Sequence, residues 1–241
     1  MGVSNKWLAL ATLLLLLSFS SMSSAQAPIQ SLQPFKATYS SEIDAALTIS
    51  GEASRELTRM DNGDWKLSAV ASAMMARAEE TTQIRLADGV ILPIHYHYHR
   101  RILGKRRTAE LKFDWVEKKV TTDIDDKPWK MDISPGVHDK LSYQLQIPID
   151  LAAGKTRLSY PVADGGRLQN YVFNVTGQER ISTPAGDYDA VRVERDRGEN
   201  SDRETFIWLA PELNYMIIKL TQIEPDGNRM SLLLKELSVH E

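Results

Sequence analysis

Three histidines alternate along one segment of the chain, at His95, His97 and His99. Successive side chains of a β-strand point to opposite faces, so the three imidazoles would share a face, with neighbours about 6–7 Å apart. Imidazole is a common zinc ligand, and a metal held by His95 and His97 with a nearby oxygen could serve a hydrolase. The outer pair is too far apart to share that ion. An exposed strand face that titrates near pH 6 is the simpler explanation, and metal binding is the alternative.

A cluster of cations follows, around a turn expected at Leu103-Gly104. Five positive side chains fall within eight residues of an acidic protein: Arg100, Arg101, Lys105, Arg106 and Arg107. A hairpin tip of this charge could dock on phosphate groups of an anionic lipid or lipopolysaccharide surface. A solvated hairpin that resists pairing at a sheet edge is the alternative. The neighbouring Tyr96, Tyr98 and Trp115 complete this candidate ligand- or surface-binding set.

Most other catalytic patterns are absent from the sequence. The chain has no cysteine, and it has no Gly-x-Ser-x-Gly segment that would place a nucleophilic serine on a sharp turn. Glycoside cleavage needs two carboxyl groups that face each other across the substrate. The spacing of Asp and Glu in the sequence does not show which carboxylates do so, and this activity stays open. The acidic run lacks the glycine and the final glutamate of a calcium-binding loop and fits a solvated turn: Asp123, Asp125, Asp126 and Asp132. The sequence leans away from an enzyme and predicts no cofactor.

Aromatic residues are spread along the segments expected to be strands. They would either fill a core between sheet layers or line an apolar cavity in a closed or half-closed sheet, with room for one lipid-like ligand. The core is the simpler interpretation, and the cavity is the functional one. The residues concerned are Trp65, Trp115, Trp129 and Trp208, together with Tyr39, Tyr96, Tyr98, Tyr143, Tyr160, Tyr171, Tyr188 and Tyr215.

The elements that must position these residues are mostly β-strands. Apolar and polar residues alternate in short runs, as in Phe35, Ala37 and Tyr39, and Asn, Asp, Gly and Pro separate the runs. Asn62-Gly63 and Asp88-Gly89 favour the tight turns of hairpins. Roughly a dozen strands approach the size at which open sheets curl or split. We therefore expect an all-β, mostly antiparallel sheet that curves into a barrel-like form or a two-layer sandwich.

One segment shows helical spacing instead. Leu141 and Leu145 lie four residues apart, and His138-Asp139 offers a carboxylate to cap a helix start. Pro148 cannot donate a backbone hydrogen bond, and it would end that helix or begin another turn. The pattern predicts one short helix near residues 138–147.

The first residues have the features of a cleavable export signal. Lys6 precedes an apolar run from Trp7 to Phe19, which is shorter than the roughly 20 residues that span a membrane. Small residues follow, and Ala25 fits the position before the cut. We therefore expect three parts of the chain: a signal peptide at 1–25, a linker at 26–34, and a single β-rich domain at 35–241.

This export signal points to the bacterial periplasm. Without cysteine, the chain carries neither a disulfide framework nor a lipid-modified residue at the cut. No later stretch is apolar enough to cross a membrane, so no transmembrane segment is expected after cleavage. The formal net charge is −3, which argues against a protein built to hold nucleic acid.

A series of short motifs follows a recognisable order along the chain. They are Tyr39 with Gly51, Pro93 with the aromatic strand after it, Phe113-Asp114, Asp139-Lys140-Leu141-Ser142, Tyr171-Val172-Phe173-Asn174-Val175, Glu179, Thr183-Pro184-Ala185-Gly186-Asp187-Tyr188, Val191-Arg192-Val193, Trp208-Leu209-Ala210-Pro211 and Asp226-Gly227. Each motif alone is weak, whereas their order and spacing are specific. From about Phe35 to Val239 the chain resembles the exported bacterial family named domain of unknown function 3108. The resemblance implies an exported β protein and brings no catalytic residues.

These observations favour a non-enzymatic periplasmic protein that binds or carries an apolar or amphipathic ligand of the cell envelope. The first alternative is an interaction module that docks on anionic surfaces through the basic hairpin. The second is a metal-dependent hydrolase that uses His95 and His97.

Overall fold

The alternating runs of the sequence form antiparallel strands, and short turns join most strands to the next. The computed structural model describes residues 32–239. The first part of this chain contains β1 (Phe35–Asp44), β2 (Thr48–Arg59), β3 (Trp65–Ala73), β4 (Ala76–Ala87), β5 (Val90–Ile102), β6 (Lys105–Asp114), β7 (Lys119–Ile124) and β8 (Pro128–Asp132). The second part contains the helix α1 (Tyr143–Ala152), β9 (Arg157–Asp164), β10 (Arg167–Thr183), β11 (Gly186–Asp196), β12 (Glu204–Ala210), the short 3-10 helix η1 (Pro211–Leu213), β13 (Met216–Ile223) and β14 (Arg229–Val239).

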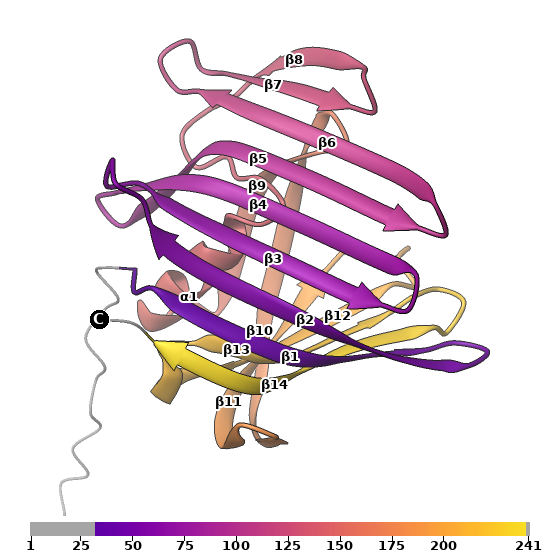
Figure 1. The fold of residues 1–241 in the computed structure, drawn as a ribbon. Coiled ribbons are helices and arrows are strands. Elements are labelled where there is room, and N and C mark those ends of the chain that lie inside the picture. Colours follow the sequence, from indigo (N-terminus) through magenta and orange to yellow (C-terminus); the bar gives the residue numbers. More distant parts are fainter. Residues whose placement is uncertain (1–31, 240–241) are drawn as a thin grey trace, which may run out of the picture.

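These strands build one sheet of 14 strands in the order β8-β7-β6-β5-β4-β3-β2-β1-β14-β13-β12-β11-β10-β9. The two halves of the chain are joined where β1 pairs with β14, from Phe35 opposite Val239 to Asp44 opposite Arg229. The sheet curls around α1, which lies on its inner side (Figure 1). The predicted fold class, an all-β antiparallel sheet that curves, is thereby confirmed.

The outer strands β8 and β9 approach each other without pairing, so the described sheet is curled rather than closed. His138, just before α1, forms a parallel bridge with Val162 of β9. Trp129 of β8 packs against the turn between β9 and β10. A β carbon at Gly166 in that turn would lie 1.1 Å from Cζ2 of Trp129, and the φ of Gly166 is +75°. Glycine is therefore required there for two reasons, close approach and backbone conformation.

The hairpin turns fall where the sequence places them. Asp88 and Gly89 both have positive φ, at 52° and 76°, between β4 and β5. Leu103 and Gly104 repeat this geometry between β5 and β6, with φ of 49° and 81°. Two successive residues at positive φ give a turn whose twist matches that of the flanking strands.

The predicted helix is present, but its bounds differ from the expected 138–147. It begins at Tyr143, and Pro148 lies inside it rather than at its end. The carboxylate of Asp139 accepts hydrogen bonds from the backbone N–H groups of Leu141 and Ser142, so it closes the turn before the helix instead of capping the helix. Burial explains why the helix tolerates its proline. Side chains on nearly every side of α1 are buried: Tyr143, Leu145, Gln146, Ile147, Asp150 and Leu151.

No helix within residues 32–239 has the length and apolar character needed to cross a membrane. The expected signal peptide at 1–25 lies outside the described residues, as does the linker at 26–34 except for its last three positions.

Candidate ligand-binding cavity

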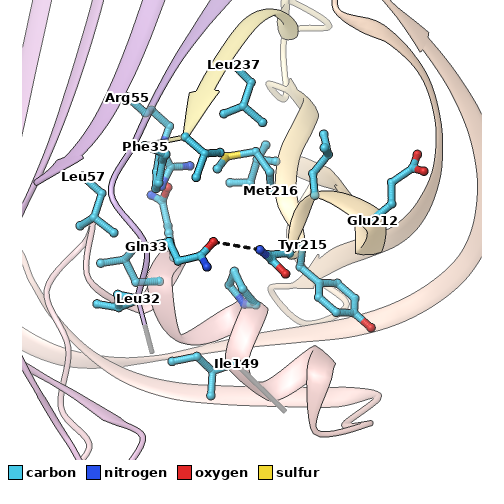
Figure 2. A pocket seen from close by; sticks show the side chains of 17 residues that line it. Leu32, Gln33, Phe35, Arg55, Leu57, Ile149, Glu212, Tyr215, Met216 and Leu237 are labelled. Atoms are coloured by element: carbon cyan, nitrogen blue, oxygen red, sulfur yellow. Dashed lines mark hydrogen bonds between the residues drawn. The ribbon is translucent and has the colours of Figure 1, made fainter. Parts of the chain in front are cut away.

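An apolar pocket of about 630 Å³ lies at the end of the sheet where β1 begins and β14 ends. Its walls come from α1, β1, β2, η1, β13 and β14, which are far apart in sequence and are brought together by the pairing of β1 with β14. Figure 2 shows side chains from these elements around the pocket. Much of the lining is apolar, including Phe35, Leu57, Leu145, Ile149, Met216 and Leu237.

A few polar groups stand among these apolar side chains. Asn214 donates a hydrogen bond of 3.2 Å to the side chain of Gln33 beside the pocket (Figure 2). Arg55 and Gln144 also reach its wall. A mostly apolar cavity of several hundred cubic ångströms with a few polar groups is the usual form of a small-molecule site.

A second cavity, of about 750 Å³, occupies the hollow on the inner face of the sheet. Its walls include four alanines of β2, β3 and β4, whose small side chains leave room there: Ala53, Ala69, Ala71 and Ala78. Arg55, Gln144 and Ile217 line this hollow as well as the apolar pocket. The two cavities therefore adjoin and share part of their walls.

Aromatic rings of α1, β9 and β10 form a packed cluster beside this hollow. The ring centres of Tyr143 and Phe173 are 5.6 Å apart, and those of Tyr143 and Tyr171 are 5.4 Å apart. Tyr160 joins the cluster, and its hydroxyl donates to Asp150 at 2.8 Å. Since Tyr143, Tyr171 and Phe173 also line the hollow, both interpretations of the aromatic residues, core and cavity wall, apply to this group.

A buried polar network fixes α1 against β4. The Asp139 side chain is fully buried, and its carboxylate accepts hydrogen bonds from the Thr82 hydroxyl at 2.6 Å and from the N–H groups of Leu141 and Ser142 at 2.8 and 2.7 Å. Burial raises the pKa of Asp139, and these hydrogen bonds act in the opposite direction. The neighbouring His138 is buried edge-on to the Tyr160 ring, and burial lowers its pKa to about 4.

His138 is expected to make the protein less stable as the pH falls from about 7 to about 5. Its ring stays neutral in the folded protein, with a pKa of about 4, whereas an unfolded histidine has a pKa of about 6.5. The unfolded chain therefore binds more protons in this range, and the folded protein loses about 2 kcal/mol. Denaturant unfolding of wild type and His138→Phe at both pH values measures this difference. The raised pKa of Asp139 stabilises the folded protein as the pH falls, and it does so equally in wild type and His138→Phe. If the free energy of unfolding changes with pH by the same amount in both proteins, His138 is not the group responsible.

The three histidines lie on the face of β5 opposite Tyr96, as alternation requires. His95 Nε2 lies 2.7 Å from Oε1 of Glu110, which Lys112 also contacts at 3.2 Å. His97 is exposed, and Nε2 of His99 is buried with no hydrogen-bond partner among the described residues. Within residues 32–239, no three His, Asp or Glu side chains come close enough together to hold a metal ion. His95 is thus engaged with a carboxylate, and that contact lowers the pKa of Glu110.

The basic hairpin forms as expected between β5 and β6. Arg100 pairs with Arg107 across the strands, Arg101 with Arg106, and Ile102 with Lys105. As far as the described residues outline the two cavities, neither is lined by any of its five cations.

The aromatic members of the predicted set are also separate from the cavities outlined by residues 32–239. Tyr96 is buried and donates to Glu80 at 3.1 Å. Trp115 donates to the backbone carbonyl of Pro93 at 2.7 Å. The cavity residues that the sequence did not reveal, such as Phe35, Arg55 and Met216, come from separate segments. The sequence-derived aromatic set did include cavity residues, among them Tyr39, Tyr143 and Tyr171.

Solved structures include a protein of similar fold. A β-barrel-like protein of the domain of unknown function DUF1849 from Brucella abortus aligns over 87% of this chain and 99% of its own, at 14% identity and a TM-score of 0.60. A candidate lipoprotein from Parabacteroides distasonis aligns over 86% of this chain and 96% of its own, at 9% identity and a TM-score of 0.32, which is too low to support an argument. The Brucella protein thus supports the β-barrel-like architecture.

No curated protein matches the sequence. A family model does match, over residues 35–233, which is most of the chain. Its description is a protein of unknown function, DUF3108. The matched region agrees with the segment in which the ordered motifs resemble that family. The chain therefore belongs to the DUF3108 family of proteins of unknown function.

Proposed function

We propose that this protein is a non-enzymatic carrier that binds one amphipathic, lipid-like ligand inside its curved sheet. The observation that carries the proposal is the pair of adjoining cavities, one apolar and one mixed in character, on the inner side of the sheet. Cavities of about 300–1,000 Å³ with mostly apolar walls are typical of sites that enclose a small molecule. A ligand with an apolar chain and a polar head would match both compartments.

The export signal expected at 1–25 supports a place for this activity in the periplasm. An apolar chain in water is unfavourable by about 0.8 kcal/mol per CH₂ group, so lipids that leave a membrane need a protein that shields them. A curled sheet with an apolar interior provides such shielding. The sequence feature and the cavity thus support the same role in the cell envelope.

Saturable binding of an apolar fluorescent probe tests the proposal. We expect N-phenyl-1-naphthylamine, which is neutral and fluoresces in apolar surroundings, to bind the purified mature protein with one site per chain. An amphipathic competitor such as lysophosphatidylglycerol should displace it. Fluorescence no higher than with a cavity-free protein of the same size would count against a carrier.

Docking on a membrane surface is a second candidate function, favoured by exposed apolar side chains at two adjacent hairpin tips. Met74 and Met75 join β3 to β4 and are 85% and 69% exposed, and Leu103 between β5 and β6 is 70% exposed. The N–H of Leu103 donates to the Met75 carbonyl at 3.3 Å, so the two tips touch. Figure 1 shows these turns along one border of the sheet. The five cations of the basic hairpin adjoin them.

The backbone at these tips strengthens this argument. Met74 and Leu103 have φ of 46° and 49°, a conformation that suits Gly, Asn or Asp and disfavours larger side chains. Met74 and Leu103 thus adopt an unfavourable backbone conformation and also expose apolar surface to water. Backbone strain of this kind is typical of functional positions. Edge protection explains only part of this cluster. Arg100 and Arg101 lie on β5, which is paired with β4 at these positions. The pairing of β6 with β7 begins at Ala109, so the edge protection that cations give applies to Lys105–Arg107 alone. Apolar tips flanked by cations suit an anionic lipid surface.

Sedimentation with lipid vesicles measures this docking. The protein is expected to bind vesicles rich in phosphatidylglycerol and to bind phosphatidylcholine vesicles weakly. Arg106→Glu with Arg107→Glu should weaken binding about tenfold or more, because each cation near an anionic surface contributes about 1 kcal/mol. Leu103→Ser with Met75→Ser should weaken it at unchanged charge. The matched control is Arg157→Glu with Arg180→Glu, on β9 and β10. Equal binding by all these proteins would rule out docking through the tips.

A further inference from the structure

Several charged side chains line the hollow on the inner face of the sheet, and half of them belong to ion pairs. Lys140 lies 3.6 Å from Asp164. Arg203 donates to Glu224 at 2.8 Å. Asp196 has a cation 3.7 Å away, the guanidinium of Arg157. These pairs neutralise one another, so they leave little net charge for a ligand to meet.

Three further arginines line the hollow without such a partner: Arg55, Arg195 and Arg197. Among residues 32–239, no carboxylate lies within ion-pair distance of any of them. The Nε–H groups of Arg55 and Arg195 are buried, and they donate to no acceptor among the described residues. A buried donor without a partner is costly, and the cost is larger for a charged group.

An aromatic ring holds Arg195 from one side. Its guanidinium lies 3.5 Å from the centre of the Tyr171 ring, so the aromatic face fixes its plane. Arg197 donates to the Thr205 hydroxyl at 3.0 Å. Burial, together with the charges of Arg195 and Arg203, lowers the pKa of Arg197 to about 10. The positive charges of Arg195 and Arg197 therefore repel each other in the hollow, and an anion would relieve that repulsion.

One carboxyl group outside these ion pairs also lines the hollow, that of Glu80 on β4. The Glu80 carboxyl group accepts a hydrogen bond of 3.1 Å from the Tyr96 hydroxyl, and burial raises the pKa of Glu80. Even in its charged form, this one carboxylate would balance only one of the three arginines. The hollow thus keeps an excess of positive charge beside the apolar pocket, and Arg55 lines both spaces.

We propose that Arg55, Arg195 and Arg197 bind the anionic head group of the ligand, a carboxylate or a phosphate, while its apolar chain lies in the adjoining pocket. This inference rests on the proposed carrier function, since it assigns the polar end of the same interior site. Guanidinium groups suit both anions because their N–H donors match two oxygens at once. The protein would accordingly prefer anionic amphiphiles over neutral ones with the same chain.

Displacement of bound N-phenyl-1-naphthylamine by palmitate, hexadecyl phosphate and hexadecanol tests this preference, because the three differ only in the head group. At least one anion is expected to bind about tenfold more tightly than hexadecanol, which corresponds to about one charge-assisted hydrogen bond. The tighter of the two anions identifies the head-group chemistry. Arg55→Gln with Arg195→Gln should lower the affinity for the preferred anion towards that for hexadecanol, and so remove the preference. The matched control is Arg192→Gln, on the same strand as Arg195 but outside the hollow.

The outcomes separate this inference from the carrier function. Equal wild-type affinity for the three amphiphiles would overturn the head-group assignment and leave the carrier in place. Binding of none of them would overturn both. The wild-type comparison needs no variant, so it decides the matter even if an arginine substitution prevents folding.

Discussion

Replacing Asp139 by alanine is expected to lower the free energy of unfolding by about 3–5 kcal/mol, because it removes the acceptor of several buried hydrogen bonds at once. The Thr82 hydroxyl and the N–H groups of Leu141 and Ser142 would lose their partner inside the protein. This network ties the turn before α1 to β4. Denaturant unfolding at neutral pH measures the change.

The variant Asp139→Asn separates hydrogen bonding from charge. Its amide oxygen can still accept the two N–H groups, and its NH₂ group can donate to the Thr82 hydroxyl oxygen. We expect it to lose about 1 kcal/mol or less. An equally small loss for the alanine variant would show that the network does not hold the helix.

Filling the apolar pocket is expected to reduce the binding of N-phenyl-1-naphthylamine about a hundredfold. Ile149 of α1 and Leu237 of β14 lie on opposite sides of the pocket (Figure 2). Ile149→Trp combined with Leu237→Trp would occupy the space that a ligand needs. To bind beside these side chains, the probe would have to displace them, at a cost of about 1–3 kcal/mol of binding free energy for each tryptophan. Each 1.4 kcal/mol lowers the affinity about tenfold. Fluorescence titration measures the loss.

The matched control carries its tryptophans outside the cavities, as Val116→Trp with Leu168→Trp. Both positions are exposed, at 89% and 42%. This variant should bind the probe as wild type does. If the pocket variant folds and still binds with wild-type affinity, the probe site lies elsewhere.

The strands and turns could be predicted because their signals are local. The alternation of Phe35, Ala37 and Tyr39 marks one buried face of β1, and Asp88-Gly89 marks a turn. Spacing also indicated a helix, but its start was misplaced. Asp139 resembles a helix cap in sequence, yet it closes the preceding turn. Pro148 resembles a stop, yet burial inside the sheet keeps the helix intact around it.

The candidate site could not be predicted residue by residue, because it depends on contacts between distant segments. Phe35 and Leu237 share a pocket only because the first and last strands pair. Arg55 and Arg195 reach one hollow from opposite halves of the sheet. The aromatic pattern indicated some of the wall, such as Tyr143 and Tyr171, but the residues chosen as the candidate site came from local runs, the His95–His99 segment and the basic hairpin. Those runs lie outside the cavities that the described residues outline.

Native mass spectrometry of the protein purified from the bacterial envelope tests the carrier function most directly. The expected spectrum contains, beside the mature chain, a complex whose extra mass is one amphipathic lipid-like molecule. That complex should be absent from Ile149→Trp with Leu237→Trp and present in Val116→Trp with Leu168→Trp. A spectrum that shows the ligand-free chain alone under gentle conditions, or one that shows a stoichiometric metal ion instead, would contradict an interior lipid carrier.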